Sequence, residues 1–333
     1  MYCAVLAALL LPHNGHWFGG TTQTVRVQVP PEYRRTDLVL TWKVEGAGAP
    51  LAAGELPVPA GGVEIQLPIE LPEVRARFQA RFSYGLRDAQ GAEIEHGEAG
   101  LFLYAKDTLS TSALETKALR PAVLDNSGEW AAVLHDAGVK CEAVRSLTAL
   151  QVLSPNLVLI GQEALPASSI AQSPIRKLAA GGARIIIMAQ SGSAQVAGHA
   201  LKPLRHPTKL DWREGHPLLA DLSYKSLLDA APALATLHFA TAKGLDRVGW
   251  RTPIGDETGV DALFAAEHIG HGWMIFCQMP VSDIASDPRG HTLLRNLIWY
   301  ATRGRPAETA RSARRADAAD DTREIHIPSG VKP

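Results

Sequence analysis

The spacing of the apolar residues changes near the middle of this chain, and the change limits the folds that the chain can adopt. In the first part, apolar and polar residues alternate, as they do over residues 24–29 and 76–84. Alternation with a period of two places the apolar side chains on one face of a β-strand. In the second part, short runs such as residues 157–161 and 184–189 are apolar almost throughout. Such runs are typical of strands buried on both faces of a parallel sheet, so we predict two domains of different class.

The alternating segments predict a β-sandwich of immunoglobulin type over residues 21–105. Six or so short strands follow one another at regular spacing, with no helical stretch between them. Gly46-Ala47-Gly48 and Gly54 indicate turns, and residues 88–91 indicate a hairpin. Three cysteines, too far apart to form a framework, provide no pair to join the two sheets (Cys3, Cys141 and Cys277).

The second region, residues 119–303, predicts an α/β domain of flavodoxin type. Helical spacing over residues 129–137, 170–180 and 289–302 alternates with the apolar strands. Gly270-His271-Gly272 is typical of a hairpin turn between two later strands.

The remaining segments are a polar linker over residues 106–118, an apolar N-terminal segment or link over residues 1–20, and a tail. The tail, residues 304–333, has charges of both signs and almost no large apolar residues, which predicts disorder. Three interpretations of the first segment stay open: an apolar segment that packs on the protein, a signal peptide, or a link from a missing upstream domain.

Composition excludes several function classes. Lys and Arg total 33 against 34 Asp and Glu, so bulk electrostatics predict no nucleic-acid partner. No apolar run reaches the roughly 18 residues of a membrane span. The histidines fall in no metal-binding motif, and no phosphate-binding glycine loop occurs, so we expect neither metal nor nucleotide cofactor.

Polar residues follow the predicted parallel strands, where ligands bind in open parallel sheets. Asp125 and Asn126 follow the first strand, Gln162 and Glu163 follow the third. Asp125 and Glu163 are therefore weak candidates for a paired acid and base. The favoured alternative is that Asp125 binds the backbone of its own turn and caps the next helix.

The turn after residues 184–189 is the place for a nucleophile, and it reads Ala189-Gln190-Ser191-Gly192-Ser193. A hydrolase elbow would carry glycine two positions before the serine, where Ala189 stands. Ser191 is a weak nucleophile candidate, since His199 and His206 have no motif around them. Gln190 joins Asn126 and Gln162 as a candidate binding residue.

Tryptophans add a possible sugar-binding surface. Trp17, Trp212, Trp250 and Trp273 are candidates to stack on sugar rings, and a place in a core or interface is at least as common for this residue. Trp17 completes our set of candidate binding residues.

Several stretches together carry a family resemblance. They are residues 13–22 (HNGHWFGGTT), 71–73 (LPE), 180–183 (AGGA), 216–219 (HPLL), 270–278 (GHGWMIFCQ), 287–288 (DP) and 293–297 (LLRNL). Across residues 12–303 the chain resembles the C-terminal region of large glycoside hydrolases of family 2, the β-galactosidase-like type. There an immunoglobulin-like domain precedes a class I glutamine amidotransferase-like domain.

The resemblance implies a role without catalysis. The catalytic acids of such proteins lie in an upstream (β/α)₈ barrel, for which this chain has neither the length nor the strand pattern. The α/β domain resembles the β-galactosidase trimerisation domain, which has lost its cysteine, and Gln190 or Ser191 at the elbow agrees with that loss.

Three hypotheses follow from these patterns. The first is an accessory region of a carbohydrate-active enzyme, which stabilises, oligomerises or presents substrate to a glycosidase domain upstream or in trans. The second is a stand-alone hydrolase that uses Asp125 and Glu163, or Ser191. The third is a secreted carbohydrate-binding protein. The implied partners are a carbohydrate, the glycosidase domain and further copies of the chain, in the periplasm or outside the cell if the parent enzyme is exported.

Overall fold

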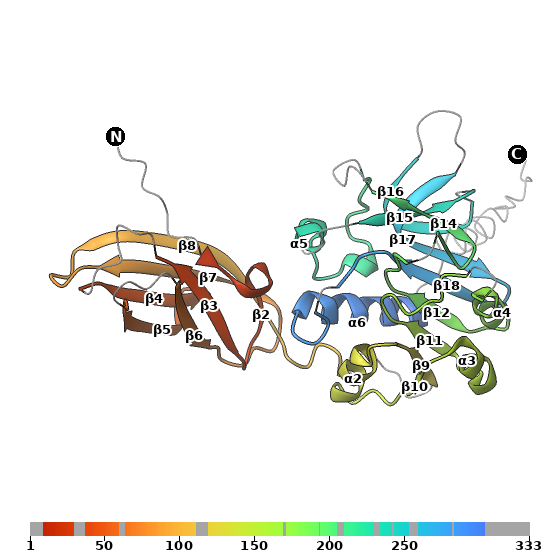
Figure 1. Cartoon of the computed structure of the whole chain (residues 1–333), viewed down its shortest axis with the longest axis horizontal. Helices are drawn as coiled ribbons and strands as arrows, with labels where there is room; N and C mark the ends of the chain where they lie inside the picture. Colours follow the sequence, from red (N-terminus) through yellow and green to blue (C-terminus); the bar gives the residue numbers. More distant parts are fainter. Residues whose placement is uncertain are drawn as a thin grey trace, which may run out of the picture.

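The protein consists of two lobes that lie side by side along the longest axis (Figure 1). The structure is a computed structural model that describes residues 9–29, 37–59, 64–110, 119–168, 171–192, 194–204, 210–229, 234–241, 243–252, 259–281 and 283–303. Strands predominate over helices in these residues, so the fold is β-rich. The predicted tail, residues 304–333, lies outside the described residues, as does most of the predicted linker.

Two sheets build the first lobe. The smaller sheet has the order β1-β3-β6, formed by β1 (Leu9–Leu10), β3 (Thr22–Gln28) and β6 (Glu64–Glu70). The larger has the order β2-β8-β7-β4-β5, formed by β2 (His16–Phe18), β4 (Val39–Gly46), β5 (Ala49–Pro57), β7 (Phe78–Arg87) and β8 (Glu93–Tyr104).

The alternation seen in the sequence explains how these sheets pack. Val25 and Val27 are buried while Arg26 between them is exposed, and Phe82 and Leu86 are buried in the same way on β7. The side chains from both sheets join one apolar cluster, so the two sheets form a sandwich.

Residues 9–18 pack on the sandwich, as one of the three interpretations of the N-terminal segment predicts, because β1 pairs with β3 and β2 pairs in parallel with β8. One expectation about this lobe is wrong. Gly54 is not a turn residue but lies inside β5, where a Cβ would come within 2.8 Å of the Trp42 ring. Glycine at this position therefore serves the packing of Trp42 rather than a change of chain direction.

A ten-stranded sheet forms the second lobe. Its parallel part has the order β10-β9-β11-β12-β18, formed by β9 (Pro121–Leu124), β10 (Glu142–Val144), β11 (Leu157–Ile160), β12 (Arg184–Ile187) and β18 (Gly272–Cys277). The predicted apolar strands thus pair in parallel. The hairpin at residues 270–271 then joins β18 to β17 (Val260–Ile269), which runs antiparallel.

The strands paired with β17 on its other side are an addition that the sequence did not indicate. Beyond β17 the order continues β15-β14-β13, with β16 also paired to β17. These strands are β13 (Gln195–Val196), β14 (His199–Pro203), β15 (Ala235–Phe239) and β16 (Leu245–Arg251).

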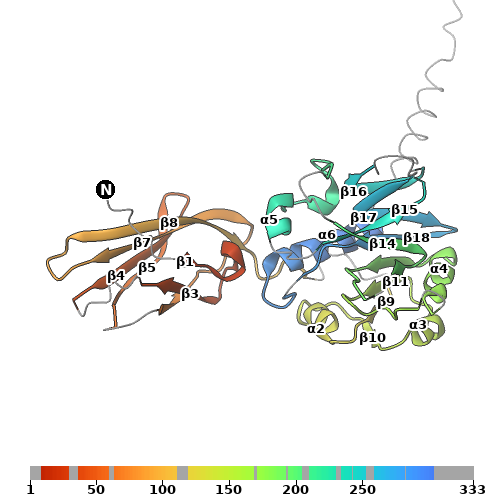
Figure 2. The ribbon, with the colours of Figure 1, turned by 45° about the horizontal axis from the view of Figure 1, so that its top comes forward.

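Helices cover both faces of the parallel strands. Figure 2 shows α2 (Glu129–Asp136) and α6 (Pro288–Arg303) apart from α3 (Leu147–Leu153) and α4 (Ser173–Ala180). Trp130 of α2 and Leu297 of α6 belong to one apolar cluster, and Leu150 of α3 and Ile175 of α4 belong to another. The described helices include none that is long and apolar enough to span a membrane.

A buried carboxylate fastens α6 to the antiparallel strands. Asp246 of β16 is only 7% exposed and accepts hydrogen bonds from Tyr300 of α6, from His216 at 3.2 Å and from Arg213 at 2.6 Å. His216 accepts the Leu218 N–H through Nδ1, so its Nε2 carries the hydrogen that goes to Asp246. Burial alone would raise the pKa of Asp246, but the His216 and Tyr300 hydrogen bonds and the Arg213 charge outweigh it and lower the pKa to about 2.

We predict that Asp246→Asn lowers the free energy of unfolding near pH 7 by about 3 kcal/mol, because it leaves buried partners without their anion. Urea denaturation measures this change. The carboxylate is ionised in the folded state above pH 4, and its contribution is lost as the pH falls from about 4 to about 2. The wild-type chain should therefore lose roughly 2 kcal/mol over that range that the variant does not lose.

The matched control is Glu214→Gln, an exposed acid in the same lobe. Glu214→Gln should change neither the free energy of unfolding near pH 7 nor the loss of stability between about pH 4 and about pH 2. An equal loss of unfolding free energy between about pH 4 and about pH 2 in the wild type and in Asp246→Asn would contradict the role assigned to Asp246.

Candidate functional site

The structure brings together the polar residues that follow the parallel strands. Asn126 Nδ2, after β9, donates to the carbonyl oxygen of Glu163, after β11, at 3.4 Å. The Glu163 N–H donates to the carbonyl oxygen of Ala189, after β12, at 3.0 Å. The sequence therefore located this edge of the sheet correctly, and the remaining question is what the side chains do there.

Asp125 acts as a cap rather than as an acid or base. One carboxylate oxygen accepts from the N–H and the hydroxyl of Ser127, at 3.0 and 2.8 Å, and the other accepts from the N–H of Trp130 at 2.8 Å. These bonds hold the turn after β9 and the first turn of α2. The carboxylate is buried.

Glu163 organises the turn where a nucleophile was considered. Its two carboxylate oxygens accept from the N–H groups of Ser191, at 2.7 Å, and Gly192, at 3.1 Å. Glu163 itself has a φ of +54°, a left-handed conformation that non-glycine residues seldom adopt. The two candidates thus meet through a backbone amide and not through the Ser191 hydroxyl.

Ser191 has no histidine base among the described residues. His199 instead meets Glu267 at 2.9 Å and packs on Phe239, while His206 lies outside the described residues. The structure therefore assembles no serine–histidine pair at this turn within the described ranges.

Gln190 occupies the elbow as a structural residue. It is 3% exposed, its side-chain oxygen accepts the Leu165 N–H at 2.9 Å, and its amide donates to the carbonyls of Gly161 and Met188 at 2.8 and 2.9 Å. Gln162 has a similar role, since its oxygen accepts the Val281 N–H at 2.9 Å. In both candidate binding residues, these side-chain groups form hydrogen bonds with loops of the protein itself.

Trp17 is not a sugar-binding residue. It is 0% exposed in the core of the sandwich, and its ring N–H donates to the carbonyl oxygen of Pro12 at 2.9 Å. Neither face of the indole can therefore receive a sugar ring.

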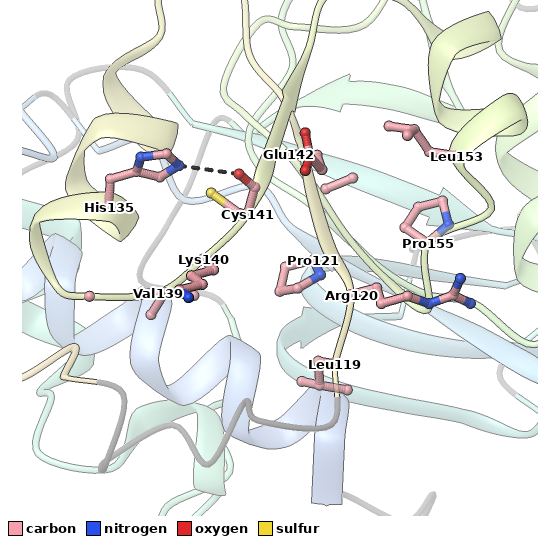
Figure 3. A pocket seen from close by; sticks show the side chains of 12 residues that line it. Leu119, Arg120, Pro121, His135, Val139, Lys140, Cys141, Glu142, Leu153 and Pro155 are labelled. Atoms are coloured by element: carbon pink, nitrogen blue, oxygen red, sulfur yellow. Dashed lines mark hydrogen bonds between the residues drawn. The ribbon is translucent and has the colours of Figure 1, made fainter.

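A cavity of about 580 Å³ lies at the opposite, amino edge of the parallel strands. Figure 3 shows it where β9 and β10 begin, with Leu119, Val139 and Leu153 among its apolar residues. Cys141 and His135 both line it, an arrangement in which a cysteine nucleophile and its base would have to be considered.

The geometry of Cys141 and His135 is not that of a catalytic pair. His135 Nε2 bonds the carbonyl oxygen of Cys141 at 3.2 Å and not the thiol (Figure 3). Burial, with the nearby Glu142 carboxylate, raises the pKa of the Cys141 thiol. The thiol therefore stays protonated and weakly nucleophilic at neutral pH.

A third group of polar residues joins the two lobes, and no sequence pattern pointed to it. Ser286 Oγ lies 3.0 Å from His13 Nε2, and His13 Nδ1 lies 4.0 Å from the Asp287 carboxylate. His13 and Asn14 both have left-handed backbone angles, with φ of +47° and +52°, which turn the chain between β1 and β2. Such strain is a reason to examine a segment for function.

The hydrogen-bond directions show that this joint is not a serine–histidine–aspartate triad. The Ser286 hydroxyl bonds the Asp283 carboxylate; burial alone would raise the pKa of Asp283, but hydrogen bonds from Ser286 and neighbouring backbone lower it. An ionised carboxylate only accepts, so the Ser286 proton points to Asp283 and His13 Nε2 must donate to Ser286. A general base would need the opposite direction.

Comparisons with known proteins assign no family. No family model matches the sequence, and no curated protein matches it. Solved structures do match, and one of them is murine CRIg, with 10% identity, a TM-score of 0.21, and coverage of 30% of this chain and 97% of that chain. A likeness at this score carries no argument about what the chain does.

We predict that iodoacetamide modifies Cys141 more slowly in the folded chain than in the urea-unfolded chain at pH 7.5, because burial and Glu142 disfavour the thiolate. Mass spectrometry of the peptide that contains Cys141 gives the rate for this residue alone. Glu142→Gln should increase the rate, since it removes the nearby negative charge.

His135→Gln is the control for a catalytic pair. It should leave the rate within about twofold of the wild type, because the imidazole bonds a carbonyl rather than the thiol. A large loss of reactivity in this variant would mean that His135 activates Cys141 after all.

Proposed function

We propose that this chain is a non-catalytic accessory region of a carbohydrate-active enzyme of the β-galactosidase-like type. It would stabilise the enzyme, support its oligomerisation or present substrate to a glycosidase domain, upstream or in trans. In this proposal the first lobe is an immunoglobulin-like domain and the second is related to the class I glutamine amidotransferases.

One observation carries the non-catalytic part of the proposal. At the sheet edge where an amidotransferase-like domain would hold its nucleophile, Gln190 bonds three backbone groups and Glu163 bonds two. Groups that act on a substrate must be available to it. Here the side chains of Gln190 and Glu163 instead hold the backbone of the loops at this edge in place.

The family resemblance behind the proposal is supported by how the resembling stretches pack against one another. Gly270 and Gly272 lie against residues 180–183: His271 N–H donates to the Ala180 carbonyl at 3.2 Å, and Trp273 N–H to the Ala183 carbonyl at 3.3 Å. A Cβ on Gly272 would come within 2.2 Å of the Ala183 oxygen. Two stretches that carried the resemblance are thus partners in one close strand–turn contact.

A second such contact involves the stretches at residues 216–219 and 293–297. Asn296 of α6 donates to the carbonyl oxygens of Leu218 and Ala220, at 3.2 and 2.7 Å. The buried amide therefore fixes η5 (Pro217–Leu219) on the helix. In both cases, stretches that carry the resemblance lie together in the folded chain, which a shared architecture requires.

The proposal predicts that the isolated chain does not hydrolyse chromogenic glycosides or esters, whereas glycosidase activity precipitates with the native protein. Antibodies against this chain should recover that activity from the source organism. An immunoblot should show whether the glycosidase domain is in the same polypeptide, as a band well above 35.7 kDa, or in a partner.

The stand-alone hydrolase makes the opposite prediction. Turnover by the isolated chain that is lost in Glu163→Gln or Ser191→Ala, but kept in Glu129→Gln, would contradict the proposal. Glu129 is the matched control because it is an exposed acid at the same edge of the sheet.

A further inference from the structure

A cavity of about 460 Å³ lies between the two lobes, and neither lobe forms it alone. This volume is within the range of small-molecule sites, which often lie at domain interfaces. The charged residues that line it, together with Tyr104, come from the sandwich, from the segment after β8 and from the second lobe: Arg75, Arg77, Tyr104, Asp107, Asp221 and Arg295.

On the sandwich side of the cavity, two arginines form no ion pair within 4.0 Å among the described residues. Arg75 is exposed and has no acidic partner within 4.0 Å in the described residues. The Arg77 guanidinium stacks on Phe102 at 4.4 Å, and its Nε is buried with no hydrogen-bond partner in that part of the chain. In contrast, Arg295 on the facing side is paired with Asp221 at 2.9 Å.

Both arginines line the same cavity, and a guanidinium group matches the planar, bidentate geometry of a carboxylate. A buried guanidinium N–H without a partner costs free energy, and an anion that reached this group would recover part of that cost. Ring stacking on Phe102 holds the Arg77 group in one orientation, so little entropy is lost when an anion binds.

The same cavity is also lined by carboxylates, and these limit which anionic ligands can bind there. Asp107 and Asp221 line it and, when ionised, only accept hydrogen bonds. They repel a ligand that presents acceptor oxygens all round, such as a free phosphate. They suit a ligand that has hydroxyl groups on the side away from its anionic group.

We infer that this cavity binds an acidic monosaccharide unit, a uronate, with its carboxylate on Arg75 and Arg77 and its hydroxyls towards Asp107 and Asp221. The anion part of the inference rests on the arginines, and the sugar part rests on the proposed function. The ligand would bridge the lobes, since its two ends lie on different ones.

Isothermal titration of the full chain tests the inference with D-glucuronate and D-galacturonate as probes. D-Glucose, D-galactose, acetate and inorganic phosphate are the comparison ligands. We expect the uronates to bind at least tenfold more tightly than each of these, because only they carry both the anion and the hydroxyls.

Arg75→Ala and Arg77→Gln should each weaken uronate binding by about tenfold or more. Arg75 is exposed, so its variant should keep the wild-type melting temperature. Arg26→Ala is the matched control: it removes an exposed arginine from β3 of the same lobe and should leave affinity unchanged.

Three results would overturn the inference. They are phosphate binding as tight as uronate binding, neutral sugars binding equally well, and uronate affinity that both arginine variants retain. None of them bears on whether glycosidase activity precipitates with the chain, so failure of this site and failure of the proposed function are distinguishable.

Discussion

The buried ion pair between Asp287 and Arg289 is the interaction on which the rest of the structure depends. The two residues are 2% and 4% exposed, and the removal of such charges from water costs several kcal/mol for each ion. The Arg289 side chain and backbone N–H donate to Asp287 at distances of 2.7–3.1 Å, and these bonds offset the cost. Any movement that separates the pair breaks these bonds between two buried charges, so the pair holds the loop that begins α6 in place.

The first lobe contacts the second at this ion pair and in the first turns of α6. The first lobe reaches the ion pair through His13, and Phe18 of β2 packs edge-on against His291 in the first turns of α6. Burial, with the nearby Arg289 charge, lowers the pKa of His16 to about 4. His16 is therefore neutral at physiological pH and adds no positive charge of its own beside Arg289.

The sequence predicted those parts of the fold that a local pattern determines. Val25 and Val27 alternate with polar neighbours, and the apolar strands at 157–160 and 184–187 pair in parallel. The sequence pattern did not predict the structure where contacts between residues far apart in the chain determine it. The sequence predicts a turn at Gly54, but the Trp42 ring packs against this glycine within a strand. β14 is partly exposed along most of its length, so no periodicity of apolar residues predicts this strand.

The candidate site shows the same limit. The order of strands and loops was enough to place Glu163 beside the turn that contains Ser191. It was not enough to show that the carboxylate binds backbone N–H groups, because these donors lie 28 and 29 residues further along the chain. Trp17 was assigned wrongly for a related reason: nothing near it indicated that β2 pairs with β8 and enters the core.

The position of α6 links the joint to the cavity between the lobes. Thr292 and Arg295 are three residues apart, so the helical spacing places both on one face, and both line the cavity. The same helix begins at the Asp287–Arg289 pair, and His291 in its first turns packs against Phe18 of the sandwich. Arg295 therefore lies on a helix, whereas Arg75 and Arg77 lie in the segment that leads into β7. A ligand that contacts both lobes would need both of these elements in their present positions. Such a ligand would in turn stabilise the contact between the lobes by mass action.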